Sequence, residues 1–151
     1  ASLIHIPIGP ANAHLVLNGL IGIILGWMAF PSIAVALALQ ALVFQFGGFT
    51  TLGVNTFVMA MPAVAAYYLF RSLVKNGSCL LAPAAGFGAG LAGIGLGTAL
   101  LALSLVTTGE EFIDVARLIA IAHLPVFFAE GIITALCVVF LRKVKPEILE
   151  A

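Results

Sequence analysis

The three histidines and one of the glutamates in this chain are side chains that could do chemistry in apolar surroundings. His5 and His14 lie within the first seventy residues, which contain no Lys, Arg, Asp or Glu. His123 and Glu130 lie seven residues apart in a second apolar stretch, a spacing that places them on one face of a helix. Neutral imidazole is a common ligand of nickel, cobalt, copper and zinc. Ionisable groups inside a membrane generally face a partner or a wet cavity. The sequence therefore suggests a metal site near the N-terminus and a proton or cation pathway nearer the C-terminus.

Each of these hypotheses has a plainer alternative. His14 is equally well interpreted as an interfacial residue that is hydrogen-bonded to its neighbours, and for His5 that interpretation is favoured. For His123 and Glu130 the favoured alternative is a helix-to-helix hydrogen bond that fixes the packing of a bundle. Pro125, between them, should free a backbone carbonyl that either side chain or a neighbouring helix can use.

The composition places all these residues in a lipid bilayer. Of 151 residues, 63% are hydrophobic and 8% are charged, whereas about a quarter are charged in a soluble domain. The net charge is zero, which gives no basic surface for nucleic acid. Cys79 and Cys137 are interpreted as packing residues, because no Cys/His metal pattern surrounds them.

Pro and Gly positions divide the chain into five apolar segments, since a helix in lipid ends only where its freed backbone groups find partners or water. The predicted helices cover about 14–29, 32–46, 54–74, 81–106 and 115–141, after a loop at 6–13. The first two are short for a spanning helix, which favours little tilt or re-entrant backbone. We expect an all-α polytopic transmembrane bundle that forms a single domain over 1–151. The opening residues read like the end of a helix, so we expect an N-terminal segment to be missing.

The distribution of charge predicts the topology. Five of the six cations close the third and fifth predicted helices: Arg71, Lys75, Arg142, Lys143 and Lys145. Because Lys and Arg near helix ends favour the cytoplasm, the tail at 142–151 is expected there. The acidic connection at 110–114 is then outside, together with an outer metal-site region at about 5–14 and 47–56. Arg117 is the exception to this pattern.

Two glycine-rich segments are interpreted differently. The glycines between 86 and 97 provide a smooth surface for close helix packing, and their G-x-G-x-x-G match has no preceding strand. The segment 47–56 instead combines turn-forming glycines with hydroxyl and amide groups, which is typical of a loop that orders a neighbouring site. The residues predicted to form this loop are Gly47, Gly48, Thr50, Thr51, Gly53 and Asn55.

Three motifs carry a resemblance to a known family. They are Ala-His-Leu at 13–15, Leu-Gln-Ala-Leu at 39–42 leading into Gly-Gly-Phe-Thr-Thr-Leu-Gly-Val-Asn at 47–55, and Leu-Pro at 124–125 followed by Ala-Glu-Gly at 129–131. Through nearly its whole length the chain resembles the CbiM/NikM family, the substrate-binding membrane subunit of energy-coupling-factor transporters for cobalt and nickel. The string at 47–55 is the specific part of this likeness.

The resemblance implies a function, a ligand and partners. It implies capture of Co²⁺ or Ni²⁺ from outside as transported substrate, with His14 as a metal ligand, Thr50, Thr51 and Asn55 in the loop that orders the site, and no organic cofactor. The family's other ligands come from an N-terminal Met-His segment that is absent here. The position of His5 is not a histidine in the family, so a supporting role in metal passage is more plausible for it than ligation. The implied partners are a membrane coupling subunit of the CbiQ/NikQ type, a cytoplasmic ATPase subunit of the CbiO/NikO type and a small CbiN/NikN-type subunit.

Two other functions are compatible with the residues alone. A proton-coupled secondary carrier would work through His123 and Glu130, and a structural assembly subunit would depend on the glycines at 86–97 rather than on any histidine. The chain carries no G-x-x-x-x-G-K-[ST] motif, so energy from ATP would have to come from partner chains. An enzyme is disfavoured, because no nucleophile and base stand at a readable spacing near the outer face.

Overall fold

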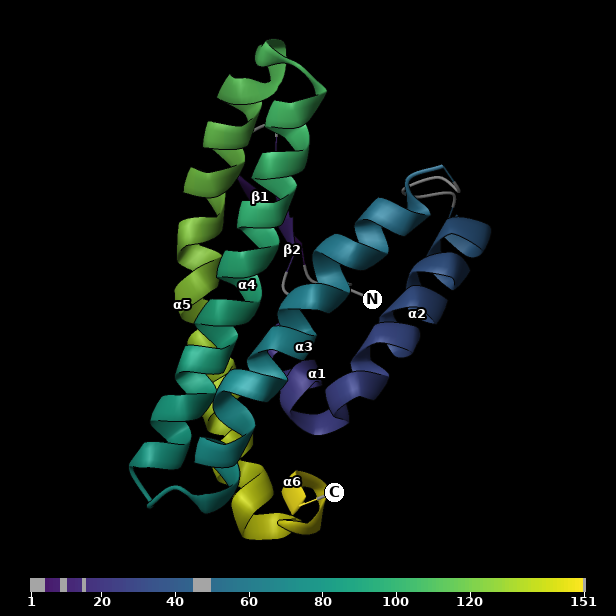
Figure 1. Cartoon of the computed structure of the whole chain (residues 1–151). Helices are drawn as coiled ribbons and strands as arrows, with labels where there is room; N and C mark the ends of the chain where they lie inside the picture. The colour runs from purple at the N-terminus through teal and green to yellow at the C-terminus, as the bar shows by residue number, and fades with distance from the viewer. Residues whose placement is uncertain (1–4, 9–10, 15, 45–49, 151) are drawn as a thin grey trace.

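The structure is a bundle of long apolar helices with a short strand pair at its N-terminus (Figure 1). The computed structural model describes residues 5–8, 11–14, 16–44 and 50–150. The elements are β1 (His5–Ile8), β2 (Ala11–His14), α1 (Asn18–Leu25), η1 (Gly26–Met28), α2 (Ala29–Phe44), α3 (Leu52–Asn76), α4 (Leu81–Thr108), η2 (Glu110–Phe112), α5 (Ile113–Val144) and α6 (Glu147–Glu150). By length and composition, four stretches are able to cross a membrane: Asn18–Val43, Leu52–Asn76, Leu81–Thr108 and Ile113–Val144. The predicted all-α membrane bundle is therefore confirmed.

Helix α4 packs at the centre of the bundle through its glycines. A Cβ built on Gly90 would lie 2.7 Å from the carbonyl oxygen of Glu130 in α5, and one built on Gly93 would lie 2.6 Å from the backbone nitrogen of Gly19 in α1. Gly88 faces the ring of Phe70 in α3. The glycines thus let three other helices approach α4 closely, as their spacing predicts.

The first predicted helix is wrong at both ends. Helix α1 begins at Asn18 and ends at Gly26, whose φ of 57° lies in the left-handed region that favours glycine. Pro31 lies between the first two predicted helices, but it does not end a helix. It lies in the first turn of α2, where a backbone N–H has no partner within the helix. With eight residues, α1 is about 12 Å long and spans less than half of a bilayer core.

Helix α1 enters the bundle and turns back. Gly22 lies against Ala63 and Gly26 lies against Tyr67, so α1 runs in the same direction as α3. After the turn η1, helix α2 returns alongside α3 in the opposite direction (Figure 1). For this part of the chain, little tilt and re-entrant backbone both stay predictions.

The segment predicted as a loop at 6–13 contains a strand pair. Strands β1 and β2 are antiparallel, with His5 opposite His14 and Ile6 opposite Ala13. His14 therefore ends a strand, whereas the sequence predicted that it begins a helix. Strand β2 lies against α5.

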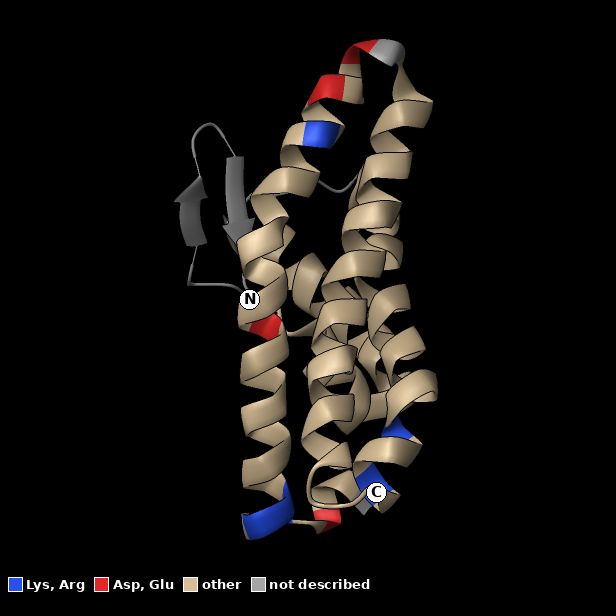
Figure 2. Ribbon diagram, turned by 90° about the vertical axis from the view of Figure 1, so that its left-hand side faces the viewer, with Lys and Arg blue, Asp and Glu red and all other residues tan. Residues whose placement is uncertain are grey.

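Charge separates the two ends of the bundle (Figure 2). The basic end carries Arg71, Lys75, Arg142, Lys143 and Lys145, and the acidic end carries the connection from α4 to α5. At the acidic end Arg117 lies 3.6 Å from Asp114, and both side chains are exposed. An exposed pair of this kind adds little stability. Arg142 instead donates to the carbonyl of Ser78 and ties the end of α5 to the start of α4.

Candidate functional site

The two N-terminal histidines are brought together by the backbone. In the ladder of β1 and β2, His5 and His14 are direct cross-strand partners. The expectation that the Pro-containing segment between them folds His5 toward His14 is thus met by the register. Their roles toward a metal stay predictions.

The segment that follows His14 is fixed by Glu130 of α5. The Oε1 atom of Glu130 accepts hydrogen bonds from the backbone N–H groups of Val16, at 2.6 Å, and Leu17, at 2.8 Å. Glu130 is fully buried. Buried carboxylates in an apolar bundle need such donors, since burying an unpaired charge is costly. The favoured packing interpretation of Glu130 is consistent with these bonds, although the donors are backbone amides and not a helix side chain.

The start of α1 lacks a capping side chain of its own. Leu17 is the N-cap residue, makes no side-chain cap hydrogen bond, and has a φ of 58°. The first N–H groups of a helix have no intrahelical acceptor, and the N-terminal end of the helix dipole favours negative charge. The carboxylate of Glu130 therefore replaces a local cap, from a position more than 110 residues away in the chain.

This contact lies at mid-height of the bundle. Glu130 is the eighteenth of the 32 residues of α5. The turn that follows His14 therefore reaches the middle of the longest helix. The turn after β2 meets α5 near the middle of that helix, and the position of His14 on the outer side stays a prediction.

Three buried polar atoms near this turn have no hydrogen-bond partner within the described part of the chain. They are Asn18 Oδ1, Glu130 Oε2 and Thr134 Oγ1. Thr134 lies one helical turn after Glu130, and Asn18 follows Leu17 directly. Such groups are rare in native interiors.

His123 does not join this site. Its Nδ1 donates to the carbonyl oxygen of Ile119 on the same helix, at 2.8 Å. The shared helix face that the seven-residue spacing predicts is present in α5, but Glu130 Oε1 accepts from Val16 and Leu17, just before α1, instead. These observations favour local anchoring over a relay between the two residues.

The predicted site-ordering loop lies at the start of α3. Thr50 and Thr51 are exposed, and Asn55 donates from Nδ2 to Thr51 Oγ1 at 3.4 Å. Gly53 is already helical, with open space where a Cβ would lie. Gly47 and Gly48 fall outside the described residues. The ordering role of this loop stays a prediction.

The described side chains do not form a closed metal site by themselves. Among them no three His, Cys, Asp or Glu residues gather in a metal-binding arrangement.

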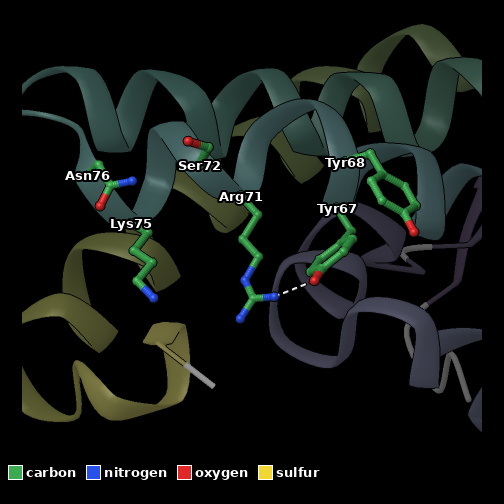
Figure 3. A pocket seen from close by; sticks show the side chains of 6 residues that line it. All are labelled: Tyr67, Tyr68, Arg71, Ser72, Lys75 and Asn76. Atoms are coloured by element: carbon green, nitrogen blue, oxygen red, sulfur yellow. Dashed lines mark hydrogen bonds between the residues drawn. The ribbon is translucent and has the colours of Figure 1, made fainter.

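A pocket that sequence reasoning missed opens at the basic end (Figure 3). It has a volume of about 310 Å³ and is lined by Tyr67, Tyr68, Arg71, Ser72, Lys75 and Asn76. The Arg71 guanidinium lies 4.8 Å from the ring centroid of Tyr67 and donates to its hydroxyl. Nearby, the Trp27 indole N–H donates to the Tyr68 hydroxyl. Aromatic and basic residues are enriched together at membrane–water interfaces, so this end is assigned to such an interface.

Comparisons with known proteins agree with the helical bundle. Residues 1–148 match the family model of CbiM, described as the cobalt uptake substrate-specific transmembrane region. A protein of Haemophilus influenzae that is provisionally named a metal transport protein is 42% identical over 151 residues, which cover 99% of this chain and 73% of the relative.

Two further relatives have names that specify a metal. The cobalt transport protein CbiM of Sorangium cellulosum is 33% identical, over 97% of this chain and 68% of its own length. The fused nickel transport protein NikMN of Rhodobacter capsulatus is 33% identical, and the chain spans about half of it, 48% of its length. No solved structure matches. A multi-pass membrane bundle that matches the family model over almost its entire length belongs to the CbiM family.

Proposed function

We propose that this protein is the substrate-binding membrane subunit of an energy-coupling-factor transporter, and that it captures Co²⁺ or Ni²⁺ from outside the cell. The observation that carries the proposal is the pairing of His5 with His14 in a strand ladder. The turn that follows His14, at Val16 and Leu17, is hydrogen-bonded to Glu130 near the middle of α5. Family membership and the names of relatives for cobalt and nickel transport support it.

The donor chemistry suits these metals. Imidazole nitrogen binds cobalt and nickel, whereas magnesium and calcium prefer oxygen ligands. The register places His5 directly opposite His14, so in the proposal one metal passing this point meets both positions. In the proposal His14 is the ligand, and His5 has a supporting role in metal passage.

The charge asymmetry supports an orientation. Lys and Arg at helix ends favour the cytoplasm, so the basic end and the C-terminal residues 142–150 are placed there in the proposal. The acidic end then faces outward, where carboxylates such as Glu111 and Asp114 favour the approach of a divalent cation.

Partner chains supply the energy in this proposal. A CbiQ/NikQ-type coupling subunit and a CbiO/NikO-type ATPase are the partners implied, and the fused NikMN relative supports a small N-type subunit. The protein acts as a carrier of metal into that assembly and not as an enzyme.

Reconstituted vesicles test this function against the secondary-carrier alternative. The chain is assembled with its coupling and ATPase partners, and uptake of radioactive ⁶³Ni²⁺ or ⁵⁷Co²⁺ is measured with and without ATP. The proposal expects ATP-dependent uptake that a protonophore does not abolish. Uptake by the chain alone, driven by a proton gradient and lost in Glu130→Gln, would establish the carrier instead.

A further inference from the structure

We infer that Glu130 is a positioning residue, whose carboxyl oxygen holds the exit turn of the His14 strand against α5. The expected effect on metal binding rests on the proposed function, whereas the hydrogen-bond geometry does not. The inference goes beyond a packing role, because the position of the predicted metal-binding segment depends on one acceptor atom, Oε1 of Glu130.

The geometry is that of one oxygen with two donors. Oε1 of Glu130 accepts hydrogen bonds from the N–H groups of Val16 and Leu17 at 2.6 and 2.8 Å, two and three residues after the end of β2. Both donors belong to the short connection between the strand ladder and α1, so the position of that connection depends on the carboxyl group.

The carbonyl oxygen of Leu17 accepts a hydrogen bond from the N–H of Ile21, so α1 begins directly from this connection, and β2 before it lies against α5. Backbone groups within an apolar bundle must be satisfied by the protein. Leu17 adopts a left-handed conformation that residues with a side chain adopt rarely. A conformation of this kind persists only where the surrounding structure enforces it, and Glu130 provides that enforcement.

Close helix packing aligns α5 with the turn but does not hold the turn. Gly90 of α4 lies against the backbone of Glu130, and Gly93 of α4 lies against Gly19. Helix α4 therefore sets the distance between α5 and α1. The hydrogen bonds from Val16 and Leu17 are then the contacts that set the path of the chain before α1.

The acceptor oxygen, and not the negative charge, is the feature that the position requires. Oε2 of Glu130 has no partner among the described residues, whereas Oε1 makes both bonds. Glutamine keeps an Oε1 acceptor and removes the ionisable group. Methionine has a similar length and no comparable acceptor. These two substitutions separate positioning from any role in proton transfer.

The test compares Glu130→Gln and Glu130→Met with the wild type, each as the whole protein in nanodiscs. Thr134→Val serves as the matched control, because it removes a polar atom one turn away that makes no hydrogen bond. Hydrogen exchange of peptides covering 11–25 is measured without metal, and far-ultraviolet circular dichroism reports the fold. Titrations with Co²⁺ and Ni²⁺ alone then give affinity, and the visible absorption of bound metal reports its coordination geometry.

The expected results differ between the variants. Glu130→Met should exchange at least about tenfold faster at 11–25 while the helices keep their protection, and should bind metal about 10–100-fold more weakly with altered absorption. Glu130→Gln and Thr134→Val should match the wild type in all readouts. A merely structural role for Glu130 would lower overall stability without changing the absorption of bound metal.

Several results would overturn the inference. A folded Glu130→Met variant with wild-type exchange at 11–25 contradicts it directly. If that variant does not fold, Glu130→Gln decides, since faster exchange at 11–25 in a folded Gln variant shows that an acceptor oxygen is not sufficient. Failure of the wild type to bind either metal would count against the proposed function, while the exchange data would still judge the positioning role.

Discussion

Replacing Gly22 with alanine should force α1 away from α3. A Cβ built on Gly22 would lie 2.0 Å from the carbonyl oxygen of Ala63 and 2.8 Å from its carbonyl carbon. Contacts of a Cβ below 3.0 Å are essentially never seen, so the two backbones must separate by about 1 Å or more. The obstacle is backbone, and no rotamer change can relieve it.

The magnitude follows from two opposing effects. Overpacking a core costs about 1–3 kcal/mol, and a backbone obstacle places this site at the upper end of that range. Alanine in place of glycine within a helix recovers about 0.5–1 kcal/mol. We therefore expect Gly22→Ala to lower the free energy of unfolding by about 2 kcal/mol.

Gly97→Ala is the matched control. The atoms nearest to a Cβ built on Gly97 lie at 3.7 Å, an ordinary contact distance. This change carries only the gain in helix propensity, so we expect it to be neutral or to stabilise by up to about 1 kcal/mol.

Unfolding of both variants is followed by circular dichroism in mixed micelles as the fraction of denaturing detergent rises. The two free energies of unfolding should differ by about 2–3 kcal/mol. Equal stabilities, or a Gly22→Ala variant more stable than Gly97→Ala, would refute the close approach of α1 to α3. Because α1 also begins at the Glu130 anchor, Gly22→Ala should in addition weaken metal binding.

Three further predictions concern orientation, pH and an unpaired hydroxyl. Cys79 is exposed at the basic end and is not the packing residue that the sequence suggested. A membrane-impermeant maleimide should therefore label it in inside-out vesicles and not in intact cells, and the opposite pattern would reverse the proposed orientation. Imidazole must be neutral to bind metal, and its ordinary pKa is about 6.5. Metal affinity should therefore be full at pH 8 and should fall about tenfold for each pH unit below about 6.5, for each coordinating imidazole. Affinity unchanged at pH 5 would contradict a histidine ligand. Thr134→Val removes a buried hydroxyl without a partner in the described structure and should raise the free energy of unfolding by about 1 kcal/mol; a loss of that size would show that the hydroxyl is satisfied.

Long apolar helices were predictable from the sequence because the bilayer dictates their length and composition. The predicted bounds of the last three helices each fall within a few residues of α3, α4 and α5. Pro125 lies inside α5, between His123 and Glu130 as expected from the sequence, and Pro62 lies inside α3. The glycines of α4 were also recognised as a packing surface, since small residues in a membrane helix have few other uses.

The N-terminal part was not predictable for two physical reasons. A short ladder that contains Pro7 looks like a loop, since proline cannot donate to a ladder and strands of four residues carry little periodicity. From the sequence, the end of the first helix is expected near Pro31 and not at Gly26. The reason is that a glycine in an apolar run gives no sign that its φ is positive. Pro31 is tolerated where helix N–H groups are free.

The candidate site was only half visible in the sequence. Glu130 stands out as an acid in an apolar span, but its donors are backbone amides of Val16 and Leu17, which carry no sequence signal. The pairing of His5 with His14 likewise depends on a strand register that spacing alone did not specify.

We would first titrate Co²⁺ and Ni²⁺ into the purified protein and into its His14→Ala variant, because metal capture at His14 is the centre of the proposed function. The account predicts one saturable site in the wild type and a loss of more than about 100-fold in affinity in the variant, since removing a ligand should cost more than removing its supporting contacts. Equal affinity in the two proteins, or no binding by the wild type, would contradict metal capture at His14.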